Sequence, residues 1–540
     1  MSEVLIALNV SESVAVAQLS ANTGQFAAKP VAAGRRELPR GLVLGVVLLA
    51  ALAINVDTTI VNVALPTLNR ELGSSTSGLQ WIVDGYNLAF AALVLAGGNV
   101  GDRLGRRGAL AGGLALFAVT SLAAALCTST EALIAARVGM GTAAALIYPT
   151  TLSVITNTFA EQGPRAAAIG AWGAVSGLGV AIGPVLGGAL LQSLWWGSVF
   201  LALIPAALLA LIGTVLVVPA SRDAARPRLD TAGLALSILM LGSLVYTVIE
   251  APTAGWLAGR SLAGFAVAAI ALVLFVAAER RHPSPLLDVG LFSNARFSAA
   301  SGAVTVAFFA LFGFIFLITQ FMQLLKGYSP LSTGVRILPV AVSIAAGSVL
   351  GTRLAITRFG TKAVVTAGLV SLAASFAWIS AITPNTPYTR VAMQMVLLGG
   401  GLGLTTAPAT ESIMGVVRPE QAGAGSAVND ATREVGGTLG VAVLGSICAS
   451  LYTQHLHPAG ALAGAPAALL ARAGSSLGEG LAIAAQTPAP LRSALHDAVT
   501  AGFLAGLHTG CLTAAGVCVA GAFSALMLLP ARPDTATREQ

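Results

Sequence analysis

About fourteen apolar runs, each long enough to cross a lipid bilayer as a helix, divide this sequence of 540 residues. A membrane-spanning helix needs about 20 mainly apolar residues, and charged or Pro/Gly-rich breaks separate the runs. The pattern therefore predicts an all-α polytopic membrane protein with about fourteen transmembrane helices. We expect these helices to begin near Gly41, Leu79, Gly108, Glu131, Ala166, Gly197, Thr231, Leu262, Phe297, Val335, Ala363, Thr389, Gly423 and Val499.

The composition agrees with a chain that lies in a membrane. Hydrophobic residues make up 56% of the sequence and charged residues only 9%, whereas soluble domains contain about 25% charged residues. The 61 glycines suit close packing between helices in lipid. The net charge of +7 comes from Lys and Arg spread through short loops, which is typical of a topology signal. We therefore expect the lipid bilayer as a partner and no nucleic acid.

The distribution of basic residues and a weak internal repeat predict the orientation and the domains. Most of the 29 Lys and Arg residues lie in cytoplasmic segments if the N-terminus is inside, and an even number of spans then places both termini in the cytoplasm. Residues 102–107 resemble residues 357–362, and many secondary transporters contain such repeats. We expect a cytoplasmic arm (1–40), an N-terminal six-helix bundle (41–220), two inserted helices with a linker (221–296), a C-terminal six-helix bundle (297–530) with a long outer loop (452–497), and a cytoplasmic tail (531–540).

Two ionisable residues lie inside apolar runs. Asp57 belongs to the first run, where a carboxylate costs about 2.5–3.5 kcal/mol on insertion scales. It is either a solvated residue at the membrane interface or a proton- or cation-binding group in an internal cavity, and its position favours the cavity. Arg137 lies in the fourth run. The free-energy cost of an unpaired charge there would be prohibitive, so Arg137 needs an acid, carbonyl groups or water as a partner.

The loop after the second run holds one acid and three arginines in a tight turn. Such a cluster either directs membrane insertion as a basic loop, or forms charge-assisted bonds to helix ends that break when two bundles rock. In the order G-x-x-x-D-R-x-G-R-R, its residues are Gly98, Asp102, Arg103, Gly105, Arg106 and Arg107.

The fifth run carries two overlapping G-x-x-x-G steps, Gly179 to Gly183 and Gly183 to Gly187, and then Gly188. A face of glycines lets two helices approach closely. Pro184 removes one helical hydrogen bond and favours a bend. Ordinary tight packing would explain the glycines, whereas the functional interpretation is a bent helix that seals the path across the membrane.

These motifs resemble those of the major facilitator superfamily. The loop 98–107 has the form of its hallmark loop between spans two and three. The sequence around Arg137 is similar to its fourth-span motif, apart from Met140, where the family often has Gln. Residues 179–188, G-x-x-x-G-P-x-x-G-G, are similar to the signature of its exporting antiporters. The stretch D-x-T-x-x-N-x-A-L-P, which begins at Asp57, resembles the signature of fourteen-span drug:proton antiporters of the QacA/EmrB-like group.

The resemblance implies a major facilitator fold of two six-helix bundles plus two inserted helices. It also implies that Arg137 takes part in proton transfer. In QacA-like pumps, acidic residues occupy the positions that match Asp57 and Asp84, so both are candidates for proton coupling and cation binding.

The thirteenth run adds two further candidates. Asp430 and Glu434 are four residues apart and therefore share one helical face, and acidic residues match both in QacA-like pumps. Arg433 would neutralise part of their charge, and a solvated helix start is the alternative interpretation. Glu411, near the end of the twelfth run, is another candidate that could instead be interfacial.

Other patterns with possible chemistry are weaker. Residues 474–478 fit G-x-S-x-G, but they lie in an Ala-rich loop and not at a strand-to-helix turn. We interpret His455 and His457 as polar surface, and the four cysteines as packing residues. No G-x-x-x-x-G-K-[ST] motif occurs, so ATP does not drive the protein directly. We expect no metal, no cofactor and no enzymatic activity.

The combined prediction is a proton-coupled multidrug efflux antiporter of the cell membrane, which exports hydrophobic, often cationic drugs by alternating access. Desolvation favours the neutral form of a carboxylate and a bound cation favours its ionised form, so drug and proton exclude one another. A dedicated exporter of one metabolite, lipid or antibiotic is the alternative among transporters. A membrane enzyme or receptor is disfavoured, because no cluster of His and Cys lies inside the spans.

Overall fold

The computed structural model describes residues 40–159, 161–221, 230–283, 285–416, 422–456, 462, 464–489 and 491–530. Within these ranges, 14 helices are long and apolar enough to cross a membrane, which confirms the predicted number. Each begins within eight residues of its predicted start. The described residues contain helices and no strands, so the all-α prediction is also confirmed.

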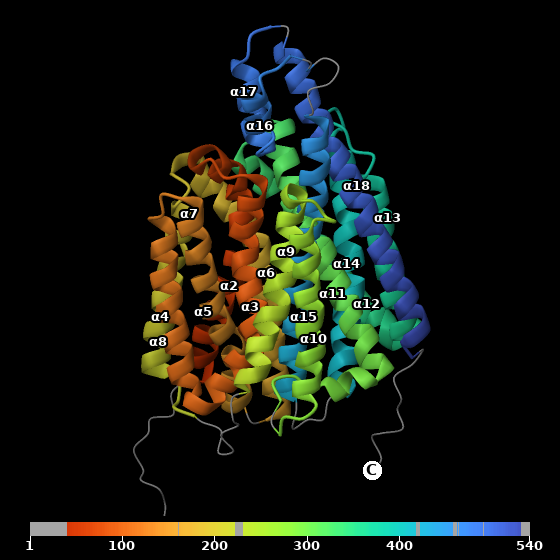
Figure 1. Cartoon of the computed structure of the whole chain (residues 1–540). Coiled ribbons are helices and arrows are strands. Elements are labelled where there is room, and N and C mark those ends of the chain that lie inside the picture. Colours follow the sequence, from red (N-terminus) through yellow and green to blue (C-terminus); the bar gives the residue numbers. More distant parts are fainter. Residues whose placement is uncertain are drawn as a thin grey trace, which may run out of the picture. The chain divides into compact units, whose positions relative to one another are not determined.

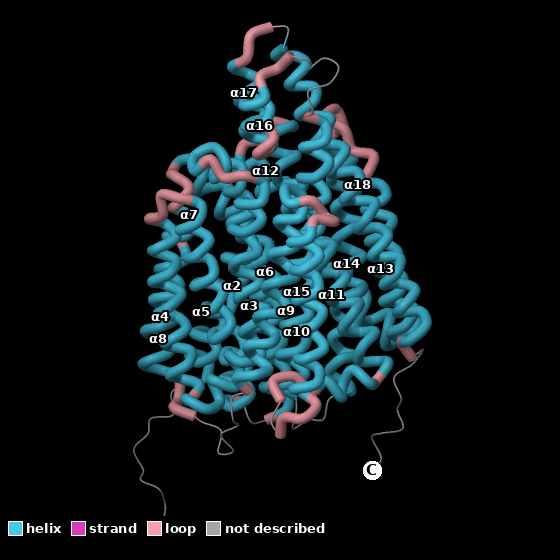
Figure 2. The backbone as a smooth tube through the Cα atoms, viewed as in Figure 1, coloured by secondary structure: helices cyan, strands magenta, loops and turns pink. Residues whose placement is uncertain are grey.

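Figure 1 labels most of the helices, and Figure 2 shows that the loops lie at their ends. The first part of the chain forms α2 (Arg40–Leu72), α3 (Thr76–Leu104), α4 (Arg106–Ala125), α5 (Thr130–Thr158), α6 (Gln162–Ser193), α7 (Ser198–Leu201), α8 (Leu203–Val217), α9 (Thr231–Ala254) and α10 (Gly259–Glu279). The second part forms η2 (Val289–Ser293), α11 (Ala295–Gln320), η3 (Phe321–Leu325), α12 (Pro330–Leu354), η4 (Ala355–Phe359), α13 (Gly360–Ile379), α14 (Tyr388–Val416), α15 (Ala422–His455), α16 (Ala467–Ala473), α17 (Leu477–Gln486) and α18 (Leu491–Leu528).

Local sequence explains where several helices begin and end. Ser75, Ser129 and Ser329 each accept a hydrogen bond from the backbone N–H three residues further on, which satisfies a donor that the helix start leaves free. Gly105 separates α3 from α4 with φ = 103°, and Gly360, the first residue of α13, separates that helix from η4 with φ = 75°. Both angles are left-handed and favour glycine. These two glycines occupy matching positions of the internal repeat.

The helices pack in two groups within residues 41–540. In the first group, α5 packs against α3 and α4, and α4 also packs against α8. In the second, α11 packs against α14, α15 and α18, while α14 packs against α12 and α13. Among the described helices, the main pairings that join the groups are α3 with α15 and α6 with α12, and α5 also touches α15. Two groups of helices that meet along such seams are the architecture in which secondary transporters rock one bundle against the other.

The predicted inserted helices, α9 and α10, differ in their contacts. Helix α9 packs against both α3 and α15, whereas α10 packs mainly against α9. The hydroxyl of Ser446 in α15 donates to the carbonyl of Val248 at 2.7 Å. The indole of Trp81 in α3 donates to the carboxylate of Glu250 at 3.4 Å. Helix α9 therefore covers one of the two seams between the groups.

The segment predicted as a long outer loop, 452–497, is more helical than expected. Helix α15 continues to His455, α18 begins at Leu491, and the two short helices α16 and α17 lie between them. Figure 1 shows α16 and α17 together at one end of the bundle, which we call the α17 end. The hydroxyl of Ser476 caps α17, and Leu495 and Val499 are fully buried. The sequence left room for one short surface helix in this segment, whereas the structure has two, because a cap and tertiary burial stabilise helices that hydropathy alone does not reveal.

Candidate functional site

The polar centre of the structure is an ion pair between the first and fourth spanning helices. Asp57 lies halfway along α2 and Arg137 lies in α5, and both side chains are 0% exposed. The Nη1 group of Arg137 donates to both carboxylate oxygens of Asp57, at 2.9 and 2.8 Å. Its Nε donates to the carbonyl of Ile82 in α3 at 3.1 Å. Arg137 thus has the acid and carbonyl partners that its position demands, and the interfacial alternative for Asp57 is wrong.

Loss of either partner of this ion pair has a large free-energy cost. Removing two charges from water offsets most of their attraction, but removal of one partner leaves an uncompensated buried charge and costs about 3–5 kcal/mol. Protonation of Asp57 has the same consequence, because it leaves Arg137 without its counter-charge. The sulfur of Met140 lies 4.0 Å from the Nη1 atom of Arg137, so the residue that departs from the family motif borders this site.

The glycine face of α6 packs against the part of α2 that carries Asp57. A side chain at Gly179 would place its Cβ 2.7 Å from the Cβ of Asn55. At Gly183 the Cβ would lie 2.9 Å from the carbonyl oxygen of Val56, and at Gly187 it would lie 3.0 Å from the carbonyl oxygen of Ile60. Only glycine permits this approach of two backbones. The fifth-span motif therefore holds α2 in place on both sides of Asp57.

The opposite side of α6 packs against α12. A Cβ at Gly188 would lie 2.6 Å from the Cα of Leu331. A Cβ at Gly334 of α12 would lie 2.7 Å from the carbonyl carbon of Pro184. Helix α6 therefore lies between a helix of the first group and a helix of the second. The bend that Pro184 was expected to cause stays a prediction.

Asp84 in α3 lies in a different environment from Asp57. Its side chain is 0% exposed, and neither carboxylate oxygen has a hydrogen-bond partner among the described residues. Gln80, one turn earlier, donates to the carbonyls of Val441 and Ala442 in α15, at 3.3 and 3.0 Å. Because residues four apart share a helical face, Asp84 lies on the side of α3 that borders α15.

The acids of α15 have no ion pair among the described residues. Asp430 is 5% exposed, and one carboxylate oxygen of Glu434 is buried without a partner. Arg433 does not bond to either acid, because its guanidinium lies over the ring of Phe308 at 5.1 Å. Arg433 nevertheless lies within electrostatic reach of both acids, so the partial neutralisation expected from sequence spacing stays a prediction. Glu411 in α14 is exposed and lies outside this buried set.

The arginines of the loop between α3 and α4 contact the end of α8. The guanidinium of Arg107 donates to the carbonyl of Val215. The backbone N–H of Arg106 donates to the carbonyl of Ser221 at 3.0 Å. The Arg107 contact is a charge-assisted bond to a helix end of the kind that the cluster was expected to form, whereas the Arg106 bond is made by its backbone, and both lie within the first helix group.

The other residues of this loop motif have simpler positions. Gly98 lies in α3, where an added Cβ would be 3.7 Å from the Cβ of Pro149. Gly105 makes the turn between the helices, and Arg103 is exposed. The side chain of Asp102 lies outside the described part of the structure. The role of the motif in conformational change therefore stays a prediction.

At the α17 end, the last loop of the second group is bonded to the first group. The side-chain amide of Asn69 donates to the hydroxyl of Ser476 at 2.6 Å. The backbone N–H of Thr76 donates to the carbonyl of Ser475 at 2.8 Å. The hydroxyl of Tyr452 donates to the carbonyl of Ser476 at 3.0 Å. Ser476 is the serine of the G-x-S-x-G pattern, and its hydroxyl is occupied by structural bonds, which agrees with rejecting that pattern as a nucleophile.

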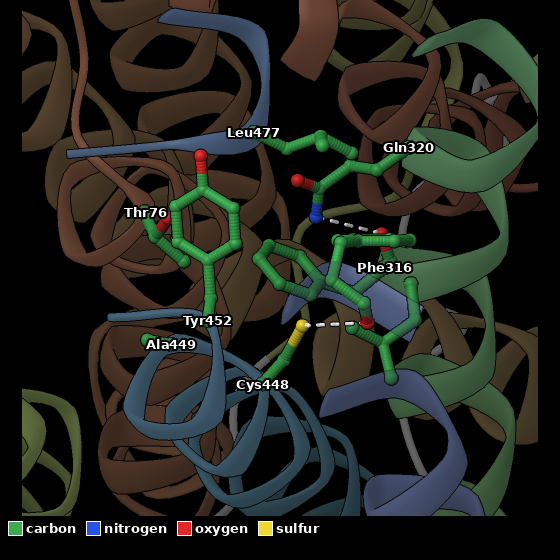
Figure 3. Close-up of a pocket in the computed structure, with 9 residues that line it drawn as sticks. Thr76, Phe316, Gln320, Cys448, Ala449, Tyr452 and Leu477 are labelled. Atoms are coloured by element: carbon green, nitrogen blue, oxygen red, sulfur yellow. Dashed lines mark hydrogen bonds between the residues drawn. The ribbon is translucent and has the colours of Figure 1, made fainter. Parts of the chain in front are cut away.

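Figure 3 shows a small pocket that two of the residues in these contacts, Thr76 and Tyr452, help to line. Helices of both groups contribute to it, together with α17. Most of its surface is apolar, and the amide of Gln320 is turned to the carbonyl of Phe316 at 3.2 Å. Its lining residues are Thr76, Phe316, Leu317, Gln320, Cys448, Ala449, Tyr452, Leu477 and Phe503.

The sequence reasoning did not single out a set of aromatic and polar residues beside the ion pair. Tyr86 and Asn87 in α3 are buried, and both side-chain polar atoms of Asn87 have no partner among the described residues. The rings of Tyr86, Phe90, Tyr148 and Trp172 form a continuous row, with successive centroids 6.1, 5.8 and 4.8 Å apart. The sequence feature that could have pointed to this set is the group of polar residues at positions 84, 86 and 87 inside an apolar run.

The described residues contain no group of three His, Cys, Asp or Glu side chains that could hold a metal ion. All four cysteines are free thiols. The ring of His455 bonds to the carbonyl of Leu451 at 2.8 Å, and His457 lies outside the described residues. The chemistry of the site is therefore that of buried carboxylates, one paired arginine and aromatic rings.

Two helix groups that meet along narrow seams, with charges at the centre of the spans, define a membrane transporter. The family model of the Major Facilitator Superfamily matches residues 47–441, and the chain belongs to that superfamily. It is a multi-pass membrane transporter and not an enzyme.

Similar proteins agree with this assignment. The chain is 36% identical over 481 residues to the multidrug efflux pump LfrA of Mycolicibacterium smegmatis, covering 89% of this chain and 94% of that protein. It is 32% identical over 515 residues to the tetracenomycin C resistance and export protein of Streptomyces glaucescens, covering 94% and 95%. Among solved structures, an inward-facing bacterial homologue of the lysosomal transporter Spinster aligns with a TM-score of 0.62 at 19% identity, covering 92% and 98% of the two chains. The last comparison concerns the fold alone.

Proposed function

We propose that the protein is a proton-coupled multidrug efflux antiporter of the cytoplasmic membrane, which exports hydrophobic, often cationic compounds by alternating access. The observation that carries the proposal is the buried ion pair of Asp57 and Arg137 at the centre of the spans. The similarity to a named multidrug efflux pump supports it. Protons and drugs are the proposed partners, and Asp57 is the proposed proton-coupling acid.

The proposed orientation places both termini in the cytoplasm and the α17 end outside, as the distribution of Lys and Arg favours. Several hydrogen bonds link the first and second helix groups at the α17 end. They include the bonds of Asn69, Thr76 and Gln80, and the bond from the Gln323 amide to the carbonyl of Val63 at 2.9 Å. In this orientation these bonds link the two groups on the outer side, and release of drug requires them to break.

The proposed coupling follows from the charges. A drug cation that enters from the inside is attracted by Asp430 and Glu434, and its positive charge favours the ionised form of Asp57 and displaces the proton from it. Return of a proton to Asp57 weakens its bond to Arg137 and resets the cycle. The driving force is sufficient in principle, since each charge gains about 2.3 kcal/mol per 100 mV and each pH unit contributes about 1.36 kcal/mol.

A dedicated exporter of one antibiotic is the second candidate. The specific observation in its favour is the similarity to the tetracenomycin C resistance and export protein over almost the whole chain. The two candidates share one mechanism and differ in the range of substrates. A drug-susceptibility panel with and without expression separates them, because a dedicated exporter protects against a single compound class.

Proton coupling is tested in energised inside-out vesicles. Addition of an exported cation should release protons from vesicles that contain the protein and leave vesicles without it unchanged. Vesicles with Asp57→Asn serve as the matched control, because this change keeps the side-chain volume and removes the titrating group. Drug uptake that persists after the proton gradient is collapsed would exclude the antiport mechanism.

A further inference from the structure

We propose that Tyr86 is a positioning residue, whose ring holds the guanidinium of Arg137 against Asp57. The inference rests on the proposed function, because it concerns the proton-coupling pair of that mechanism. The guanidinium carbon of Arg137 lies 4.3 Å from the centroid of the Tyr86 ring. The side chains of Tyr86 and Arg137 are both 0% exposed. A cation over an aromatic face is attracted by the ring's negative charge, most strongly where water is absent.

Helix α3 supplies two of the contacts that hold Arg137. The carbonyl of Ile82 accepts a hydrogen bond from Nε, and the ring of Tyr86 lies over the guanidinium plane. Residues 82 and 86 are four apart and share a helical face. The guanidinium is therefore fixed from α3, and only Nη1 bonds to Asp57. Its Nη2 group is buried without a partner among the described residues.

The ring of Tyr86 carries this role, and its hydroxyl does not. The hydroxyl is buried and makes no hydrogen bond of good geometry within the described residues, although the side chain of Thr58 lies near it. The Thr58 hydroxyl donates to the carbonyl of Ile54 at 2.9 Å, and it is not a base that could take a proton from Tyr86. Loss of the hydroxyl should therefore be tolerated, whereas loss of the aromatic face should not.

The consequence is a change in the proton affinity of the pair. The charged and titratable groups that face Asp57 are Arg137 from α5 and Tyr86 from α3. Glu434 of α15 lies within electrostatic reach of Tyr86, on the side of the second helix group. Without the ring, Arg137 is held less firmly and stabilises the Asp57 carboxylate less. Asp57 then keeps its proton to higher pH.

The test measures drug-evoked proton release by the purified full-length protein as a function of pH. Proton release requires an acid that is protonated before the drug is added. The amount of proton released therefore falls as the pH rises through the titration range of that acid, which gives the pH profile a falling limb. Tyr86→Met removes the ring and should move this falling limb upward by about one pH unit. Tyr86→Phe should reproduce the wild-type profile. Phe90→Leu is the matched control, since Phe90 is a buried aromatic residue one turn along α3 that packs on Tyr86.

Two outcomes would overturn the proposal: a Tyr86→Phe profile that matches Tyr86→Met, or a Tyr86→Met profile that matches Phe90→Leu. If Tyr86→Met does not fold, fluorinated phenylalanines at position 86 provide the second series. They weaken the negative face of the ring and keep its shape, so the falling limb should move upward with each added fluorine, and a constant limb would overturn the proposal. Absence of proton release from the wild type would instead refute the proposed antiport.

Discussion

Asp57 in α2 and Glu434 in α15 are both carboxylates inside spanning helices, but within the described residues Asp57 makes an ion pair and Glu434 does not. Asp57 receives two bonds from Arg137, whereas Glu434 has a buried oxygen without a bond. Arg433, the cation next to Glu434 in sequence, lies instead over the ring of Phe308. We therefore propose that the paired acid holds and releases a proton against a fixed counter-charge, and that the acid without an ion pair accepts the drug cation.

The largest effect is expected for Asp57→Asn, which should abolish export of every substrate. Arg137 would keep only its carbonyl and ring contacts, and an uncompensated buried charge costs about 3–5 kcal/mol. Drug resistance of cells, normalised to the amount of protein in the membrane, is the measurement. Full resistance at normal expression would show that the paired acid does not couple protons.

A second test disturbs the paired region without changing a charge. Gly183→Leu should impair transport of all drugs alike, because a side chain there meets Thr59 and the carbonyl of Val56, next to Asp57. Overpacking of this kind costs about 1–3 kcal/mol or more. Gly177→Leu is the matched control on the same helix, since a Cβ at Gly177 meets nothing within 4 Å. Equal transport by both variants would contradict the importance of the α6–α2 contact.

The smaller change Pro184→Ala should impair transport if the bend is needed.

The unpaired acids should determine charge preference. Asp430→Asn or Glu434→Gln should weaken export of divalent cations more than of monovalent cations. One ion pair at 4 Å is worth about 4 kcal/mol at an effective dielectric of 20, before desolvation, and the net loss should be about 1–3 kcal/mol. Paired mono- and divalent biocides provide the readout, with Glu131→Gln, an exposed acid at the start of α5, as control. Equal loss for both drug classes would reassign these acids to proton coupling or folding.

The smallest effect is expected far from both acid sites, at the α17 end. Asn69→Ala removes the 2.6 Å bond to Ser476, and one hydrogen bond contributes about 1 kcal/mol net. This should favour opening on that side about fivefold, given that a factor of ten corresponds to about 1.4 kcal/mol. Accessibility of a cysteine introduced at Thr76, compared in otherwise cysteine-free proteins with and without Asn69→Ala, measures the opening. Unchanged labelling would show that this bond does not hold the end closed.

The amino-acid sequence by itself determined the class, the fourteen spans and the presence of charges within them. Hydropathy is a local property, so each run marks its own helix, and caps such as Ser75 and Ser129 lie beside the helices they start. The glycine face of the fifth run was also visible from spacing alone. These features depend on residues within one or two helical turns of each other.

Only the tertiary structure decided which residues meet. Arg137 pairs with Asp57, 80 positions earlier in the chain, whereas the guanidinium of Arg433 lies over the ring of Phe308 and makes no ion pair with the acids one and three positions distant. Tyr86 contributes its ring because α3 lies beside α5, and Ser476 caps α17 while it bonds to Asn69. In lipid, helix partners are selected by close packing of small residues and by satisfaction of buried polar groups. Both depend on which faces come together, so the spacing of residues along one helix does not reveal the partner of a buried charge.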